Sequence, residues 1–264
     1  MVENTDNLIY DELFLSKSKK TDVSLFVSGA EQLGTSWCAL SIMHALNIFK
    51  KKVLFVDGNG NLSNVASYLN LSHPFYLDDY FEGKKTLNQL VLAYKNIDFN
   101  ILTAKSGNKY LVGQNIGRIQ LFSQDLHILA ENYDFVAIDL GTDVEAKNLS
   151  LCQIAKNIVI LCSENSADIV KTFDLIKFMN NVGFINKCKL IINKTNSYDE
   201  GYKIYKKLKK ATERNGLKFP ELLGIIRLDT RIRDTIKNKE LLLTRYFESE
   251  AAQDICDIAK KLEV

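Results

Sequence analysis

The sequence predicts an α/β protein built on a single doubly wound, mostly parallel sheet of about seven strands with helices on both faces. Short apolar runs rich in β-branched and aromatic residues recur along the chain. They are continuous rather than alternating, as expected of parallel strands that are covered on both faces. Helical patterns lie between these runs, and strands that alternate with helices are typical of βαβ units.

The apolar runs and the helical patterns give the expected order of elements. The expected strands are residues 23–28, 52–57, 99–104, 133–140, 157–163, 188–193 and 222–228. Apolar residues at helical spacing predict helices within residues 40–49, 119–131, 167–180, 197–215 and 251–262.

Two of the expected helices carry defined apolar positions. The helix at 197–215 has Tyr202, Tyr205 and Leu208 as its apolar positions. The last helix carries an apolar stripe formed by Ala252, Ile255, Ala259 and Leu262. We expect this stripe to dock on the sheet, with a lipid surface as the alternative.

The length and composition are those of one globular domain. The chain has 264 residues, of which 46% are hydrophobic and 25% are charged, which is enough to form a substantial core. We expect residues 22–264 to form that domain. Residues 1–21 are polar apart from the piece NLIYDELFL, and we expect them to be either a mobile tail or a short partner-binding helix.

Charge and cysteine usage favour a cytoplasmic protein without a metal cluster. The net charge of +2 predicts no strong attraction to nucleic acid. The five cysteines are scattered without a C-x-x-C pair, as expected of buried thiols in a reducing compartment. The sequence shows no secretory signal pattern, no apolar run of membrane-spanning length and no obvious C-terminal membrane-targeting helix.

A glycine-containing loop lies between the first expected strand and the first expected helix. The stretch Ser28–Trp37 reads SGAEQLGTSW, and from Gly29 the spacing is G-x-x-x-x-G-T-S. This is the pattern of a phosphate-binding P-loop with Thr35 in place of the lysine. Such a loop points backbone N–H groups at phosphate, and the hydroxyl that follows the lysine, here Ser36, binds Mg²⁺. An ordinary strand-to-helix turn is the alternative.

Polar residues also follow other expected strands, and sheets of this class bind ligands at the carboxyl ends of their strands. Asp57, Asp139 and Asn193 lie at such ends, where each is either a ligand-binding group or a cap of a loop or helix. Trp37 is expected to pack in the core rather than to serve as a ligand platform. Glu31 is either a solvated charge or an acceptor that occupies the phosphate position of the loop.

Segments in the same order along the chain match one known family. Ser28–Ser36 aligns with its loop S-G-K-G-G-x-G-K-[ST], and Asp57–Asn64 aligns with its segment D-A-D-L-G-L-A-N. The segments YDFVAIDLGTD, SENSADIVKTFDLIK and LIINKTNSYDEG are similar to later segments of that family. From Val23 to the C-terminus the chain thus resembles the MinD/ParA group of P-loop ATPases and, within it, the flagellar-number regulators called FlhG.

The resemblance implies a MinD-like P-loop NTPase fold and a set of site residues. The implied nucleotide-binding loop contains Gly29, Ala30, Glu31, Gln32, Gly34, Thr35, Ser36 and Trp37. The adenine would lie near Asn193. The groups implied for Mg²⁺ and its outer shell are Ser36, Asp57 and Asp139. Mg·ATP or ADP is therefore the candidate ligand, and no cofactor is assigned as certain.

The chain departs from the family where the family carries charge. The family's signature lysine falls on Ala30, its second loop lysine falls on Thr35, and its catalytic carboxylate falls on Asn59. A lysine about 4 Å from a phosphate charge contributes roughly 4 kcal/mol at an effective dielectric near 20. The helix N-terminus that remains contributes only about 0.3–2 kcal/mol. We therefore expect ATP hydrolysis to be absent or very slow, and we assign no catalytic residue.

The predicted function is that of an FlhG/MinD-like regulator of the number and placement of flagella or related polar machinery, acting as a pseudo-ATPase. Two alternatives stay open. One is a working ATPase whose missing cation comes from Lys105, Lys109 or Lys194, and the other is a pilus or secretion assembly scaffold. The resemblance implies a signal-recognition-type GTPase and flagellar switch components as partners, a homodimer, and recruitment to the cell pole or inner-membrane face.

Overall fold

The computed structural model describes residues 21–59, 65–95, 98–105, 110–142 and 144–263, so the expected tail at residues 1–21 lies outside the described part except for Thr21. Its strands are β1 (Asp22–Ser28), β2 (Val53–Asp57), β3 (Leu92–Ala93), β4 (Phe99–Leu102), β5 (Phe135–Gly141), β6 (Asn157–Cys162), β7 (Cys188–Thr195) and β8 (Glu221–Arg227). The longer helices are α2 (Thr35–Ile48), α7 (Ile116–Ala130), α9 (Ser166–Asn181), α10 (Tyr198–Arg214), α11 (Arg231–Asn238) and α13 (Glu250–Leu262). The shorter ones are α3 (Val65–Leu69), α4 (Leu77–Phe81), α5 (Leu87–Leu90), α6 (Tyr110–Gly113), η1 (Ala146–Asn148), α8 (Leu149–Ile154), η2 (Ile185–Lys187) and α12 (Leu242–Arg245).

The eight strands form one sheet in the order β3-β4-β2-β5-β1-β6-β7-β8. All neighbouring strands are parallel except β3, which pairs antiparallel with β4. The predicted doubly wound, mostly parallel sheet is therefore confirmed, with the two-residue strand β3 as an addition. Because β1 lies between β5 and β6, the loop that follows it emerges at the middle of the sheet.

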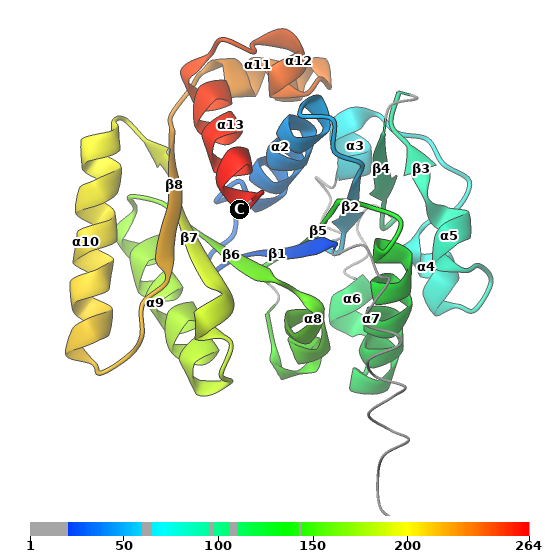
Figure 1. The fold of residues 1–264 in the computed structure, drawn as a ribbon, viewed down its shortest axis with the longest axis horizontal. Coiled ribbons are helices and arrows are strands. Elements are labelled where there is room, and N and C mark those ends of the chain that lie inside the picture. The colour runs from blue at the N-terminus through cyan, green and yellow to red at the C-terminus, as the bar shows by residue number, and fades with distance from the viewer. Residues whose placement is uncertain (1–20, 60–64, 96–97, 106–109, 143, 264) are drawn as a thin grey trace, which may run out of the picture.

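The central strands are buried on both faces, which explains why their apolar runs are continuous. In β1, Leu25 and Val27 join a core that also contains residues of α7, α8 and α9. Phe26 points the other way, into a core shared with α2 and α13. Figure 1 shows this arrangement, with α2 and α13 above the sheet and α7, α8 and α9 below it.

The helix α13 docks on the sheet through the stripe that the sequence predicts. It packs against β8 and α2. The stripe residues are all buried: Ala252, Ile255, Ala259 and Leu262. Gly224 of β8 allows the close approach, because a Cβ atom there would lie 2.3 Å from Cγ1 of Ile258.

One predicted apolar position of α10 is wrong. Tyr202 is 49% exposed, and the buried face of α10 is formed instead by Gly201, Ile204, Leu208 and Thr212. A small residue is needed at position 201, since a Cβ atom there would lie 2.6 Å from a methyl group of Ile225. The buried stripe thus includes a glycine and a threonine, which an apolar pattern does not reveal.

The strand β8 lies at one end of the sheet, and charged side chains cover part of its outer edge. Nζ of Lys261 donates a hydrogen bond of 2.9 Å to the carbonyl of Leu223. The N–H of Arg227 donates to Oδ2 of Asp254 at 2.9 Å, and its guanidinium pairs with the same buried carboxylate. Backbone groups that would otherwise attract another strand are therefore occupied by side chains.

Four of the five cysteines are buried, as predicted, whereas Cys256 is half-buried. Among the described residues, no group of three or more His, Cys, Asp or Glu side chains is placed to hold a metal ion. The helices of the described ranges are all too short or too polar to span a lipid bilayer.

Candidate functional site

The loop that connects β1 to α2 lies at the carboxyl edge of the sheet, where the sequence places the candidate phosphate site. Gly34 adopts a left-handed conformation, with φ of 84°, directly before the first residue of α2. Gly29 lies against the backbone of α9, and a Cβ atom there would be 2.5 Å from the carbonyl of Lys171. Both glycines of the pattern are therefore required by the geometry.

The residues that stand at the two lysine positions are buried and uncharged. Ala30 is 4% exposed and Thr35 is 6% exposed. Glu31 and Gln32 are exposed, and Gln32 has a φ of 60°. A left-handed conformation costs a residue other than glycine about 1–2 kcal/mol. The loop thus keeps a backbone shape that suits glycine although a glutamine now occupies the position.

Three side chains hold the loop through its carbonyl oxygens. Oγ of Ser28 donates to the carbonyl of Ala30 at 3.0 Å. Nδ2 of Asn193 donates to the carbonyl of Leu33 at 2.8 Å. Nζ of Lys194 donates to the carbonyl of Gln32 at 2.6 Å.

The backbone N–H groups of the same loop, unlike its carbonyl oxygens, are not bound by the protein in the part of the chain that the structure describes. Within the described part of the chain, the backbone N–H groups of residues 31–36 donate no hydrogen bond. Several of them belong to the first turn of α2, whose N–H groups have no partner inside the helix. Clustered N–H groups at a helix N-terminus form a cradle for an anion, so the loop fits a phosphate group although it lacks both lysines.

Glu31 does not occupy this cradle. Its side chain is exposed, and it makes no hydrogen bond or ion pair in the residues that the structure covers. The interpretation of Glu31 as a solvated loop charge therefore agrees with the structure, whereas its placement at the phosphate position does not.

The two candidate metal carboxylates lie side by side on neighbouring strands. Asp57 of β2 is the register partner of Asp139 of β5, and both side chains are buried. Oδ2 of Asp57 accepts the N–H of Val65 at the start of α3, at 3.0 Å. Oδ1 of Asp139 accepts the N–H of Gly141, also at 3.0 Å. Each carboxylate thus caps a local segment, which is the structural alternative that the sequence left open.

Asp139 also lies near the start of α2. Burial raises the pKa of the Cys38 thiol, and the negative charge of Asp139 raises it further. The hydroxyl of Ser36, half-buried in the same helical turn, belongs to the same candidate set. Carboxylate and hydroxyl oxygens are suitable ligands for Mg²⁺, so Ser36, Asp57 and Asp139 are the residues that would hold the ion.

Asn59, at the position of the family's catalytic carboxylate, lies over the end of β5. Gly141 has a φ of 56°, and a Cβ atom there would be 2.5 Å from Nδ2 of Asn59. The carbonyl of Gly141 also accepts a 3.4 Å hydrogen bond from Oγ of Ser28. The structure therefore brings together the ends of β1, β2 and β5, and sequence reasoning had not assigned Ser28 or Gly141 a role.

Asn193 and Trp37 are both engaged within the protein. Asn193 is 3% exposed, and its amide both donates to the loop and accepts the N–H of Lys194 at 2.9 Å. Trp37 is half-buried against the core shared by α2 and α13. The ring N–H of Trp37 has no partner among the described residues. The assignment of Asn193 to adenine stays a prediction, because in this structure its amide supports the loop.

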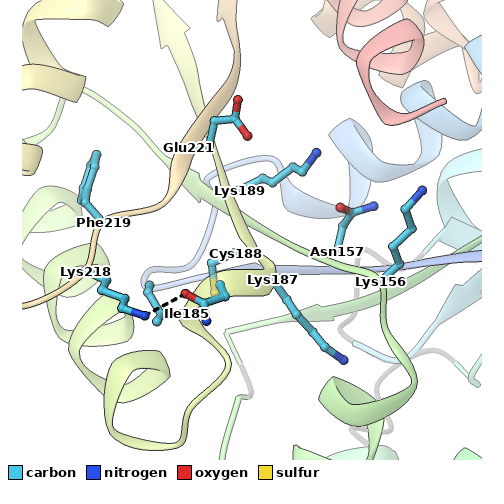
Figure 2. A pocket seen from close by; sticks show the side chains of 10 residues that line it. Lys156, Asn157, Ile185, Lys187, Cys188, Lys189, Lys218, Phe219 and Glu221 are labelled. Carbon is cyan, nitrogen blue, oxygen red and sulfur yellow. Dashed lines mark hydrogen bonds between the residues drawn. The ribbon is translucent and has the colours of Figure 1, made fainter. Parts of the chain in front are cut away.

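A cavity of about 450 Å³ lies far from the loop, at the amino edge of the sheet. Four lysines line it: Lys156, Lys187, Lys189 and Lys218. Figure 2 shows that their side chains point in different directions rather than toward a common point. Lys156 pairs with Asp22, and Nζ of Lys187 donates to three carbonyls, those of Cys152, Gln153 and Ala155. The cavity is therefore not a converging anion site.

Comparison with solved structures defines the fold. The fold matches the MinD cell division protein of Aquifex aeolicus with a TM-score of 0.76, over 92% of this chain and 97% of that chain, at 18% identity. It matches a ParA family ATPase from Chlorobium tepidum TLS with the same TM-score of 0.76, over 91% of this chain and 99% of that chain, at 18% identity. The chain thus has the MinD/ParA-type P-loop ATPase fold that the sequence predicts.

Sequence comparison identifies a homologue within this class. The chain is 23% identical to the antiactivator FleN of Pseudomonas aeruginosa over 239 residues, which are 89% of this chain and 84% of FleN. No family model matches the chain. The chain therefore has a MinD/ParA-type fold and is similar in sequence to FleN, so the predicted resemblance to this group is confirmed.

Proposed function

We propose that this chain is an FlhG/MinD-like regulator of the number and placement of flagella, or of related polar machinery, and that it hydrolyses ATP very slowly or not at all. Similarity to an antiactivator over most of both chains supports the regulatory part. The loop supports the second part, because Ala30 and Thr35 stand buried where the family has lysines.

The expected loss of hydrolysis follows from what the loop retains. Its N–H groups can donate hydrogen bonds to an anion. The loop itself has no cation to neutralise the charge that develops on a transferring phosphoryl group. Asn59 has an amide where the family has a carboxylate, so it cannot carry the negative charge of that group. Binding and hydrolysis are therefore separable here: the cradle favours the first, and the missing charges oppose the second.

Phosphate release by the purified full-length chain with Mg·ATP tests the second part. We expect a rate no higher than that of the Ser36→Ala variant, since Ser36 would hold the Mg²⁺ that any family-type hydrolysis needs. A rate well above this variant would contradict the pseudo-ATPase.

A cell experiment tests the regulatory part on its own. Expression of the chain in Pseudomonas aeruginosa cells that lack FleN should change the number of flagella per cell, counted by electron microscopy. Cells that lack FleN and carry the empty vector serve as the negative control. An unchanged flagellar number, with the protein present at normal abundance, would argue against the role.

The partners that we propose are a signal-recognition-type GTPase and components of the flagellar switch, together with a second copy of the chain. They are proposed because the homologue is an antiactivator, a description that implies action on another protein. Recruitment to the cell pole or the inner-membrane face would then occur through such a partner. Affinity capture from motile cells, with beads that carry no protein as the control, checks these partners directly.

A working ATPase with a cation from outside the loop is the second candidate, and one contact favours it. Nζ of Lys194 reaches the loop at 2.6 Å from the carbonyl of Gln32. Of the other two lysines considered from the sequence, Lys109 lies outside the described residues. The backbone N–H of Lys105 donates to Asp78, and Lys105 makes no hydrogen bond to the loop within the described residues. Loss of phosphate release in Lys194→Met but not in Lys189→Met, with the order of the loop backbone unchanged, would favour this candidate.

A further inference from the structure

The contact between Lys194 and the loop joins two residues with unusual backbone conformations. Lys194 has a φ of 63° and Gln32 has a φ of 60°, and both lie in the left-handed region that disfavours side chains other than glycine, asparagine and aspartate. Such conformations persist only where the surrounding structure holds them, and they gather at functional sites. Here the 2.6 Å hydrogen bond from Nζ of Lys194 to the carbonyl of Gln32 links the two positions.

Asn193 extends this contact to the next peptide group. Its Nδ2 donates to the carbonyl of Leu33, and its Oδ1 accepts the N–H of Lys194. Two consecutive loop carbonyls, those of Gln32 and Leu33, are thus bound by two consecutive residues of β7. Asn193 is buried, so water does not compete strongly for its amide.

The geometry of a trans peptide sets where the N–H groups of these peptides point. The described chain contains no cis peptide bond, and in a trans peptide the C=O and the following N–H point in opposite directions. The carbonyls of Gln32 and Leu33 point at β7. The N–H groups of Leu33 and Gly34 therefore point away from β7, and they are among the loop donors without a partner in the described residues.

We propose that Asn193 and Lys194 form a brace that holds the loop N–H groups in position for a phosphate-type anion, and that Lys194 is a positioning residue rather than the cation that pairs with phosphate. Its ammonium group binds the carbonyl of Gln32, on the side of the loop opposite to the N–H donors. The proposal rests on the proposed function in so far as it concerns the same loop, but it requires neither hydrolysis nor a flagellar role.

The brace explains how the loop keeps its shape without its lysines. In a working P-loop the bound phosphate itself helps to order the donors around it. A loop that has lost both lysines gains little from charge, so affinity depends on donors that are already ordered before binding. The side chains of β7 supply that order from outside the cradle.

Nuclear magnetic resonance on the full-length chain tests the brace, with the backbone order parameters of Leu33 and Gly34 as the readout. We expect values near those of the strands, about 0.85, in the unmodified protein, and values below about 0.6 in Lys194→Met. Lys194→Arg keeps a donor at this position and should restore order. Lys189→Met removes a half-buried lysine of β7 that lines the distant cavity, and should change nothing at the loop.

Inorganic pyrophosphate is the binding probe, titrated into the same four proteins. We expect Lys194→Met to bind it about fivefold more weakly and Lys194→Arg to recover most of the affinity, because ordering the loop then costs binding free energy. Loss of affinity in Lys194→Met with unchanged order parameters would overturn the brace and make Lys194 a ligand cation. Absence of pyrophosphate binding to the unmodified chain at millimolar concentration would also overturn the proposal. Neither result depends on flagellar number, which tests the proposed function separately.

Discussion

The two edges of the sheet use positive charge in opposite ways. The amino edge holds four lysines around one cavity, yet Lys156, Lys187 and Lys218 are bonded within the protein and their side chains diverge. The carboxyl edge has a loop without lysines, but its N–H groups gather at the start of α2 without partners in the described residues. The carboxyl edge is therefore the candidate anion site of the two, because the direction of hydrogen-bond donors matters more for such a site than the number of charges.

The largest expected effect is on stability, and it tests how closely the loop at the carboxyl edge packs against α9. Gly29→Ala places a Cβ atom 2.5 Å from the backbone of Lys171, which cannot move without shifting α9. We expect the free energy of unfolding to fall by about 3 kcal/mol, the upper range for overpacking. Urea titration measures it. Gly113→Ala, which meets nothing within 4 Å, is the matched control and should change stability little.

Restoring the loop lysine tests how much a positive charge adds to nucleotide affinity when the N–H donors are already in place. Thr35→Lys should tighten the binding of Mg·ATP about 100-fold, or roughly 2.7 kcal/mol, because a cation then joins donors that are already oriented. Calorimetry measures the affinity. Asn186→Lys adds a fifth lysine to the amino-edge cavity and should leave nucleotide affinity unchanged. An equal gain in both variants would break the comparison between the two edges.

A pH experiment examines α2, the helix that runs from the loop through the core. Burial, together with the smaller effect of the positive charge of Lys95, lowers the pKa of His44 to about 4. Between pH 4 and 6.5 the unfolded chain binds more protons than the folded one, so stability rises with pH in that window. We expect acidification from pH 7 to pH 5 to cost about 2 kcal/mol through this residue.

His44→Leu should remove this part of the pH dependence, as urea titrations at the two pH values will show. The control is His127→Gln, which changes an exposed histidine at the end of α7. If His44→Leu and the unmodified protein lose the same stability between pH 7 and pH 5, the titrating group lies elsewhere.

The smallest expected effect concerns the amino edge. Nζ of Lys187 donates to the carbonyls of Cys152, Gln153 and Ala155 at the end of α8, at 3.1, 2.8 and 2.7 Å. Lys187→Met should lower the thermal midpoint by the equivalent of about 1 kcal/mol, since these carbonyls lose a charged donor. Lys189→Met lines the same cavity but loses no hydrogen bond among the described residues, so its midpoint should stay close to that of the unmodified chain.

The longer elements were predictable from the sequence because their patterns are long enough to read. All seven predicted strands correspond to strands of the sheet, within a few residues at their ends. β3 contains only Leu92 and Ala93, too few residues to show a pattern. The helices of four to six residues, α3, α4, α5, α6, α8 and α12, were missed for the same reason, and the eight-residue helix α11 was not predicted either. Tyr202 was misassigned because a tyrosine suits both a core and a surface.

The candidate site was predictable in its location but not in its internal contacts. The glycine spacing and the strand–helix order placed the loop correctly at residues 29–36. The hydrogen bond from Lys194 to Gln32 joins positions 162 residues apart and depends on two left-handed backbones. No local sequence signal encodes such a contact. The sequence named Lys194 only as a cation near a strand end, and it gave no indication that Ser28 holds the loop.

The edge of β8 that side chains cover affects how copies of this protein can associate. Lys261 and the Arg227–Asp254 pair occupy backbone groups that would otherwise recruit a foreign strand. These covered groups cannot pair with a strand of another molecule, which disfavours edge-to-edge association of sheets at this margin.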